Sequence, residues 1–473
     1  MLALCLGTAV PLQAKTNRPP NFIVIFVDDM GYADAGAFGS KVHRTPNLDR
    51  MAKEGRKLTS FYVASSVCTP SRAALMTGSY PRRVGLHTSP AGSANPLVLF
   101  PGSSRGLNPD EVTLAEVLKK RGYATGIIGK WHLGDQPQFL PTRQGFDTYF
   151  GIPYSNDMGV EVGHSFPPLP LMRDEKVIEQ EPDQSLLTQR YTQQAVQFIQ
   201  RNKDNPFFLY LPHTMPHFPQ YASERFKGKS ANGIYGDTIE ELDWSVGRIL
   251  DSLRQLRIDE NTFVLFTSDN GGVPAPILTY RGSNGPLRGW KGSTWEGGMR
   301  VLAIARWPGR IPSGTVTDEM ILSTDMLPTF AKLAGAEVPS DRVIDGKDAW
   351  PVLAGAANAA TPHDRFYYYQ MGYLAAVRSG QWKLHVIRTA YNKDTKKTDM
   401  EDVLELYDLA KDIGETANVA DRHPDVVRRL QAMLAEARED IGDDQTKDAG
   451  KNVRPAGYIA MPKTLTRGDS SRK

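Results

Sequence analysis

Four short apolar runs along the chain each lead directly into polar residues that are suited to chemistry. The runs cover residues 22–27, 124–128, 207–211 and 262–267. Unbroken apolar runs of this length favour strands that are buried on both faces of a parallel sheet. The polar residues that follow are, in chain order, Asp28 and Asp29, Lys130 and His132, His213 and His217, and Asp269 and Asn270. Because open α/β sheets bind ligands at the carboxyl ends of their strands, we expect these side chains at one edge of one sheet.

Helical patterns fall between the predicted strands. Residues 45–55 and 113–120 carry apolar positions at helical spacing, and Gly55 is suited to end the first of these helices. The clearest helix covers 237–256, where Asp237 is the expected N-cap and Glu240 follows three residues later. Strands that alternate with helices predict a doubly wound α/β fold.

The pattern changes near residue 365, where short strands follow one another without helices between them. Strands are predicted at 366–369, 374–378, 382–386 and 403–408, and an amphipathic helix at 425–437. They predict a small α+β subdomain with an antiparallel sheet over residues 366–445, after a main domain at 21–365. Residues 446–473 are polar, and we expect them to form a loosely attached tail.

The composition is that of a folded protein with balanced charge. The chain has 473 residues, of which 40% are hydrophobic and 23% charged, and this argues against disorder. Its formal net charge of +3 argues against a nucleic-acid binder that works by bulk charge. No uninterrupted apolar stretch of about 18 residues predicts a membrane span.

The first 14 residues, MLALCLGTAVPLQA, are apolar and end in a small residue. This pattern predicts a signal peptide at 1–14 and therefore a periplasmic or secreted protein. A lipoprotein anchored at Cys5 is the weaker interpretation, because Leu4 before it is not small. Removal of this segment would leave Cys68 as the single cysteine, which is either a buried apolar residue or a reactive one.

The segment from Val67 to Gly78 (VCTPSRAALMTG) is the most informative stretch of the chain. Thr69 or Ser71 is expected to cap a helix through residues 73–76, which would place Cys68 at a helix N-terminus. Arg72 adds a positive charge one turn away. The residues alone leave two interpretations open: a capped helix with a buried cysteine, or a thiolate nucleophile with a lowered pKa.

The stretch Cys68-Thr-Pro-Ser-Arg72 also resembles the signature of the type I sulfatases, whose cysteine is oxidised to formylglycine. Further blocks resemble the same family in the same order: TPNLD at 45–49, GKWHLG at 129–134, SDNGG at 268–272, KGSTWEGG at 291–298 and LYDL at 406–409. The resemblance is closest to the arylsulfatase A and N-acetylgalactosamine-6-sulfatase branch. It implies an alkaline phosphatase-like fold, with a large mixed, mostly parallel sheet flanked by helices, and a catalytic domain at 21–365. It also implies partnership with a formylglycine-generating maturation enzyme.

Oxygen ligands near the strand ends suggest a metal site. Three carboxylates and one amide suit a hard divalent cation better than zinc, although either pair alone could instead cap the segment after it. The resemblance implies that these residues, together with the oxygen of formylglycine at position 68, bind Ca²⁺, with Mg²⁺ as the lesser alternative. The ligands would be Asp28, Asp29, Asp269, Asn270 and the modified Cys68.

The resemblance also implies roles for the remaining polar residues. In the family the aldehyde is hydrated, one hydroxyl attacks sulfur as Asp269 takes its proton, and the second hydroxyl later expels sulfate. Arg72 would hold the hydrated aldehyde, and His132 is the candidate base for the expulsion step. The expected sulfate-binding residues are Lys130, Lys291 and Ser155, with Ser155 also within reach of the diol. His217 is the predicted general acid, and His213 is the alternative or a substrate contact.

The implied activity is hydrolysis of a carbohydrate sulfate, with aryl sulfates as surrogate substrates. The alternatives are a phosphate mono- or diesterase of the same superfamily and a non-catalytic relative that binds sulfated glycans. A two-metal phosphatase would need more Asp and His ligands than the one cluster visible in the sequence. Four further residues could contact a sugar or be ordinary loop residues: Asp157, His164, Arg281 and Trp295.

Overall fold

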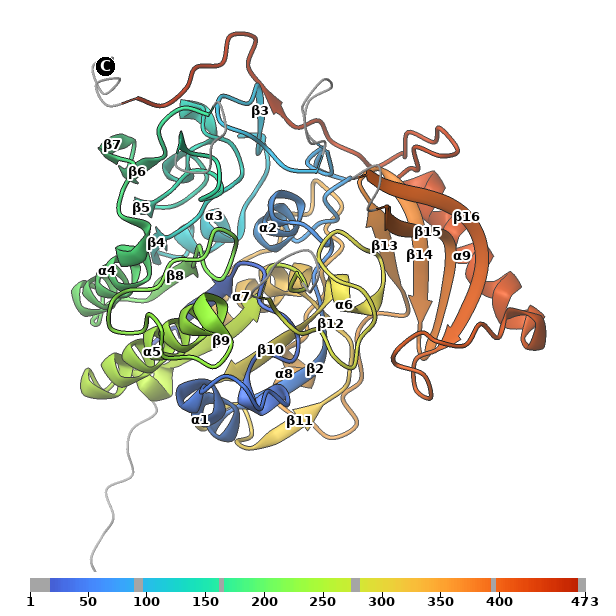
Figure 1. The fold of residues 1–473 in the computed structure, drawn as a ribbon, viewed down its shortest axis with the longest axis horizontal. Helices are drawn as coiled ribbons and strands as arrows, with labels where there is room; N and C mark the ends of the chain where they lie inside the picture. Colours follow the sequence, from blue (N-terminus) through green and yellow to red (C-terminus); the bar gives the residue numbers. More distant parts are fainter. Residues whose placement is uncertain (1–17, 89–96, 161–165, 274–280, 393–396, 467–473) are drawn as a thin grey trace, which may run out of the picture.

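The structure, a computed structural model, describes residues 18–88, 97–160, 166–273, 281–392 and 397–466. The predicted signal peptide at 1–14, including Cys5, and the candidate sugar contact His164 lie outside the described residues. A large sheet with helices on both faces forms the main part of the molecule, and a smaller sheet packs beside it (Figure 1). No helix within the described ranges is long and apolar enough to span a bilayer.

The four predicted apolar strands are neighbours at the centre of the large sheet. They are β1 (Asn21–Val27), β4 (Ala124–Ile128), β8 (Phe207–Pro212) and β9 (Thr262–Ser268). Their order is β9-β1-β8-β4, and every pair among them is parallel. Their carboxyl ends therefore share one edge, as the sequence predicts.

The remaining strands extend the sheet on both sides and make it mixed. The full order is β11 (Thr315–Thr317), β2 (Arg56–Tyr62), β10 (Arg300–Arg306), β9, β1, β8, β4, β5 (Thr148–Gly151), β6 (Pro170–Arg173) and β7 (Lys176–Gln180), with β12 (Ile321–Leu322) paired to β2. Strand β10 runs antiparallel to both of its neighbours, and β6 and β7 are antiparallel at the far edge. The predicted mixed, mostly parallel sheet is confirmed.

Alternate residues of the central strands face two separate apolar cores. In β1, Phe22 and Val24 belong to one core, whereas Ile23 and Ile25 belong to the other. The first core contains α2 (Cys68–Thr77), α3 (Leu114–Lys119) and α7 (Met326–Ala334), and the second contains α1 (Pro46–Glu54), α4 (Leu187–Arg201) and α5 (Gly233–Gln255). Burial on both faces explains why these strands are unbroken apolar runs. Two shorter helices are α6 (Glu296–Met299) and α8 (Trp350–Leu353).

Two predicted helix starts are wrong in detail. Helix α5 begins at Gly233, and the carboxylate of Asp237 instead accepts hydrogen bonds from the backbone of residues 228–230. Helix α2 begins at Cys68 with Val67 as an N-cap that makes no side-chain bond. The Thr69 hydroxyl donates to the carbonyl of His132, so it is engaged between segments and does not cap the helix.

The smaller sheet confirms the predicted antiparallel subdomain. Its order is β13 (Phe366–Gln370), β14 (Tyr373–Ser379), β15 (Trp382–Asn392) and β16 (Lys397–Asp408), and α9 (Pro424–Asp440) packs on β14 and β15. After α9 the chain crosses back over the main part of the molecule (Figure 1), where β17 (Gly457–Tyr458) pairs with β3 (Arg105–Gly106). Arg454 is ion-paired with Glu111, so the described part of the predicted polar tail contacts the main part of the molecule.

Candidate active site

Two neighbouring strands deliver oxygen ligands to the shared edge. Asp28 and Asp29 follow β1, and Asp269 and Asn270 follow β9. The backbone N–H of Asp29 donates to Asp269 Oδ1 at 3.2 Å, and Asn270 Nδ2 donates to Asp29 Oδ1 at 2.7 Å. All four side chains are buried. The structure therefore brings the predicted metal-ligand set together.

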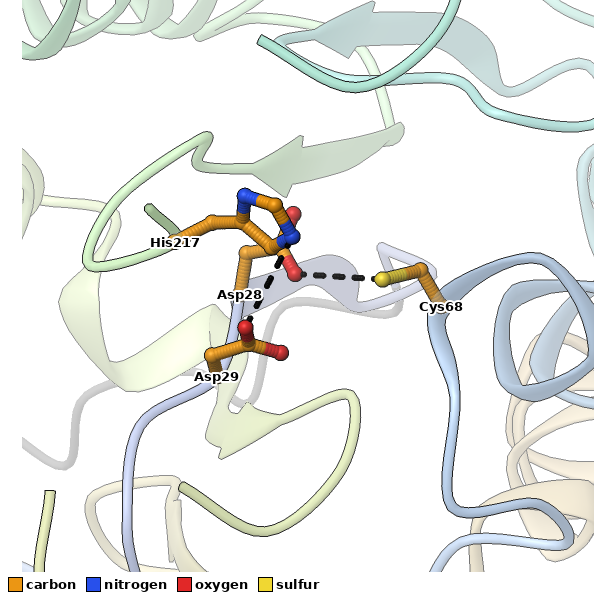
Figure 2. A group of neighbouring side chains, drawn as sticks. All are labelled: Asp28, Asp29, Cys68 and His217. Carbon is orange, nitrogen blue, oxygen red and sulfur yellow. Dashed lines mark hydrogen bonds and ion pairs between the residues drawn. The ribbon is translucent and has the colours of Figure 1, made fainter. Parts of the chain in front are cut away.

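Cys68 faces these carboxylates from the first residue of α2. Its Sγ lies 3.5 Å from Asp28 Oδ1 and 3.5 Å from Lys291 Nζ. Figure 2 shows Cys68 and His217 pointing toward the two aspartates, and one possible ligand atom from each of these four residues lies within 4.8 Å of the others. Burial and the nearby Asp28 raise the pKa of the Cys68 thiol. Burial, followed by the nearby carboxylate of Asp28, thus argues against the interpretation of Cys68 as a thiolate with a lowered pKa.

Arg72 lies one helical turn beyond Cys68 and is fully buried. One guanidinium nitrogen lies 2.8 Å from Asp269 Oδ2 and 3.4 Å from Asp28 Oδ2, while the other donates to the carbonyl of Lys130. This guanidinium thus ties the two carboxylate-bearing strand ends to the segment after β4. Burial and the nearby Asp28 raise the pKa of Asp269. A carboxyl group with a raised pKa is suited to accept and release a proton.

Two lysines converge on the same aspartates. Lys130 Nζ lies 2.5 Å from Asp28 Oδ2 and donates to Ser155 Oγ at 3.1 Å, so the structure brings Ser155 to the site. Lys291 Nζ lies 2.7 Å from Asp29 Oδ1. Burial alone would lower the pKa of each lysine, but Asp28 beside Lys130 and Asp29 beside Lys291 raise it. Both lysines are therefore fixed cations at the edge of the sheet.

The remaining histidines occupy different surroundings. His132 is buried, its Nε2 lies 2.9 Å from the carbonyl of Leu99, and burial followed by Lys130 holds the pKa of the ring well below its usual value. His213 Nε2 lies 3.1 Å from Ser245 Oγ on α5, and burial lowers its pKa to about 3. The structure thus places His213 against a helix, and its contacts do not join it to the carboxylate cluster.

His217 reaches the cluster and is oriented by a residue that the sequence did not indicate. Its Nε2 lies 3.7 Å from Asp29 Oδ2, and its Nδ1 lies 3.0 Å from Asn156 Oδ1. The amide group of Asn156 donates to Gln184 Oε1 and to the carbonyl of Pro219, which leaves its oxygen facing His217. No motif signals this role, although Asn156 directly follows the predicted Ser155.

The donor set fits a hard divalent cation. Asp28, Asp29 and Asp269 supply carboxylate oxygens, and Asn270 Oδ1 is a buried oxygen without a hydrogen-bond partner among the described residues. An unpartnered buried acceptor costs free energy unless a ligand satisfies it. Oxygen atoms in this number and of this kind are the donors that Ca²⁺ and Mg²⁺ take in proteins.

Comparisons with known proteins agree with this geometry. A family model described as Sulfatase matches residues 20–336, and one described as N-sulphoglucosamine sulphohydrolase, C-terminal, matches residues 290–440. N-acetylgalactosamine-6-sulfatase of Mus musculus is 38% identical over 99% of this chain and 96% of its own length. Arylsulfatase A of Homo sapiens is 40% identical over 93% and 91%. The chain belongs to the sulfatase family. It is a sulfatase, a sulfuric ester hydrolase, as the resemblance of its motifs predicts.

Solved structures place the sulfatase fold in its wider context. PsFucS1 sulfatase from Pseudoalteromonas sp. superposes with a TM-score of 0.82 at 29% identity over 93% of each chain. Phosphonate monoester hydrolase of Agrobacterium radiobacter has a TM-score of 0.59 at 20% identity, which is a likeness of fold alone. Both agree with the predicted alkaline phosphatase-like architecture.

The structure has an open pocket of about 930 Å³ whose lining contains none of the clustered carboxylates or lysines but includes Trp290, the chain neighbour of Lys291. Its lining includes Lys41, His43, Arg281 and Trp290, and Trp290 directly precedes Lys291. The predicted sugar contact Arg281 thus lines a pocket, whereas Asp157 lies close to Ser155 and His217, which hold the pKa of its carboxyl below the usual value despite burial. For Trp295 the structure favours the other alternative, an ordinary structural residue: its buried ring packs against the guanidinium of Arg288 and does not line this pocket.

Proposed function

We propose that this sulfatase removes sulfate from a sulfated carbohydrate, using formylglycine made from Cys68 and a bound Ca²⁺ ion. The observation that carries the proposal is the position of Cys68, at a helix N-terminus between Asp28 and Lys291, facing the oxygen ligands of the sheet edge. A carbohydrate substrate is supported by a relative named N-acetylgalactosamine-6-sulfatase. It is also supported by a structure 31% identical to this chain that was solved with a neocarrahexaose.

The cation and the modified residue would share one site. Asp28, Asp29, Asp269 and Asn270 would hold Ca²⁺, with Mg²⁺ as the alternative, together with an oxygen on the side chain of residue 68. The hydrated formylglycine supplies two hydroxyls on one carbon, and the cation supplies positive charge beside them. The conversion requires a formylglycine-generating maturation enzyme as a partner, and a periplasmic or secreted location stays a prediction from residues 1–14.

The fixed cations of the chain are placed to bind the sulfate group. Lys130 pairs with Asp28 and Lys291 with Asp29, and each ammonium group carries donors beyond those used by its carboxylate partner. Ser155 Oγ, held by Lys130, adds a neutral donor. Preorganised donors aimed at developing negative charge are the largest single contribution in many enzymes. Arg72, which pairs with Asp269 and lies one helical turn beyond residue 68, would hold the hydrated aldehyde.

Proton transfer is divided between residues on different segments. His217 Nε2 faces the cluster, and we assign it the donation of a proton to the departing alcohol oxygen. Asp269 would accept the proton of the attacking hydroxyl. His132 is assigned the proton of the second hydroxyl, through its Nδ1, which has no hydrogen-bond partner among the described residues.

The pocket lined by Trp290, the chain neighbour of Lys291, would receive the carbohydrate. It is open, it contains the aromatic ring of Trp290 for stacking against a sugar face, and Lys41 and Arg281 line it. These basic side chains suit a substrate that carries further acidic groups. The pocket therefore favours a sulfated oligosaccharide or a sugar with a second anionic group.

The test is hydrolysis by protein co-expressed with a formylglycine-generating enzyme. Mass spectrometry of the peptide that contains Cys68 should show the aldehyde or its hydrate, and 4-nitrophenyl sulfate should be hydrolysed with a higher kcat/KM than 4-nitrophenyl phosphate. Cys68→Ala should fold and lack turnover. A clear preference for the phosphate would favour the phosphatase alternative, and an aldehyde without turnover on sulfated sugars would favour the glycan-binding one.

A further inference from the structure

A cluster of buried charges joins the catalytic domain to the small C-terminal sheet. Glu296 begins α6, Lys383 and His385 lie on β15, and Glu415 follows β16. All four are completely buried, with no side chain accessible to solvent. Charged residues are almost never fully buried unless they are paired, so a cluster of this kind calls for an explanation.

Lys383 is the centre of this cluster. Its Nζ lies 3.0 Å from Glu296 Oε1, 2.8 Å from Glu415 Oε1 and 2.9 Å from the carbonyl oxygen of Thr294. An ammonium group has three donors, and these three acceptors use all of them. The ammonium also lies 3.9 Å from the centre of the Tyr368 ring. The position of Lys383 is therefore fixed from every side.

Glu415 and His385 bind the segment 288–296 of the catalytic domain at further points. Glu415 Oε2 accepts from the backbone N–H of Glu296 at 2.8 Å, and the carbonyl of Glu415 accepts from Arg288 at 2.6 Å. The ring of His385, whose Nε2 lies 3.0 Å from Glu415 Oε1, packs on the ring of Trp295 with centroids 4.4 Å apart. The small sheet thus holds this segment at positions 288, 294, 295 and 296.

Lys291 lies in the middle of the held segment. Its Nζ contacts Asp29 and the sulfur of Cys68, and the next residue, Gly292, donates its N–H to the carbonyl of Ser66. Within α6, the carbonyl of Gly298 accepts a hydrogen bond from the N–H of Gly271, which is next to the metal-ligand candidate Asn270. A shift of this segment would therefore change the position of Lys291 relative to both Asp29 and residue 68.

We propose that Lys383 and Glu415 are positioning residues that hold Lys291 in its sulfate-binding place, so that the C-terminal sheet completes the active site. The proposal rests on the proposed function of Lys291. Neither residue touches the carboxylate cluster; both act through segment 288–296. Well-packed apolar residues can replace buried ion pairs without loss of stability, so stability alone does not explain why this cluster is charged. The directional bonds to Thr294 and Glu296 offer a geometric explanation, because they fix the position of the segment.

The first test is amide hydrogen exchange of the full chain with Lys383→Met. Amides of segment 291–297 should exchange at least about tenfold faster, while those of β1 stay unchanged. The matched control is Arg306→Met, because Arg306 is equally buried, pairs with Asp259 and Glu54, and lies at the opposite end of β10. Unchanged protection of 291–297 in Lys383→Met, or equal loss in Arg306→Met, overturns the proposal.

The second test is a double-mutant cycle with Lys291, using 4-nitrophenyl sulfate and rates per aldehyde-bearing enzyme. Lys383→Met should lower kcat/KM about tenfold or more in the native background and less than about threefold in a Lys291→Ala background. Equal fractional losses in the two backgrounds contradict the proposal. Glu415→Gln keeps an oxygen for the Glu296 N–H, so it serves in both tests if Lys383→Met does not fold, with smaller effects of the same sign.

The two tests separate the inference from the proposed function. Wild-type protein that carries the aldehyde but hydrolyses no sulfate ester would contradict the proposed function. The exchange experiment would still decide whether the C-terminal sheet holds the segment of Lys291, because it needs no turnover.

Discussion

Replacement of His217 by glutamine tests how the departing alcohol receives its proton. His217 Nδ1 faces two oxygens that can only accept, Asn156 Oδ1 and the carbonyl of Phe218. The Nδ1 atom therefore carries a proton in every charge state of the ring. Nε2 is left facing Asp29, and it is the atom available to donate into the site.

The expected magnitude depends on the leaving group. A positioned general acid contributes about 10²–10⁴-fold, or about 3–5 kcal/mol of the barrier, when the departing oxygen is strongly basic. A 4-nitrophenolate leaves without protonation, so its loss should be less than about tenfold. Asn156→Ala removes one of the two acceptors that orient the ring. A hydrogen bond worth about 1 kcal/mol predicts a loss of about fivefold in kcat/KM on the substrate with the basic leaving group, smaller than the loss in His217→Gln.

The assay compares kcat/KM for 4-nitrophenyl sulfate with that for a sugar sulfate that releases an alkoxide, in wild type, His217→Gln and Asn156→Ala. Aldehyde content and thermal midpoint are measured for each variant, so that incomplete maturation or unfolding is not mistaken for lost catalysis. An equal fractional loss on both substrates would refute the assignment of His217 as the acid, because only the basic leaving group needs a proton.

Three further outcomes are expected. Chelation of divalent cations should abolish turnover and lower the thermal midpoint, Ca²⁺ should restore both, and Asn270→Ala should weaken Ca²⁺ binding measured by calorimetry at least about tenfold. Gly129→Ala should lower kcat/KM at least about 100-fold, because its Cβ would lie 1.9 Å from the carbonyl oxygen of Pro212 beside Lys130, whereas Gly122→Ala, with open space around it, should not. Burial raises the pKa of Asp243 from 3.8 to about 6, so its contribution to the free energy of unfolding falls as pH rises from about 4 to 6, on the order of 3 kcal/mol. In Asp243→Asn, the free energy of unfolding measured by chemical denaturation should not show this part of the decrease between about pH 4 and pH 6.

The sequence predicted the centre of the fold better than its edges. The four central strands bury both faces, so their apolar runs are unbroken, and β4 was predicted with the bounds that the structure has. Strand β2 was not predicted. Its residues are unevenly buried, so its sequence RKLTSFY mixes polar and apolar positions and contains no unbroken apolar run. Helix α5 extends four residues before Asp237, because tertiary contacts of that carboxylate take precedence over its capping preference.

Site residues were predictable where a strand end or a motif marked them. Strand order alone explains why Asp28 and Asp269 meet, since β1 and β9 are parallel neighbours. Asn156 and Lys383 were missed for a physical reason: each acts through another side chain, and such contacts depend on packing between distant segments. Lys383 had one signal, a charged residue between Trp382 and Leu384 in a predicted strand.

The charges of the site bear on how a sulfate ester is distinguished from a phosphate ester. The ionised side chains at the sheet edge are three carboxylates and three cations: Asp28, Asp29, Asp269, Arg72, Lys130 and Lys291. These six charges cancel, so a bound divalent cation makes the total positive. A positive site attracts a phosphate monoester dianion at least as strongly as a sulfate ester monoanion. Selection between two tetrahedral anions therefore has to come from where the donors lie, and the buried cluster that we propose holds Lys291 would set the position of one of these donors.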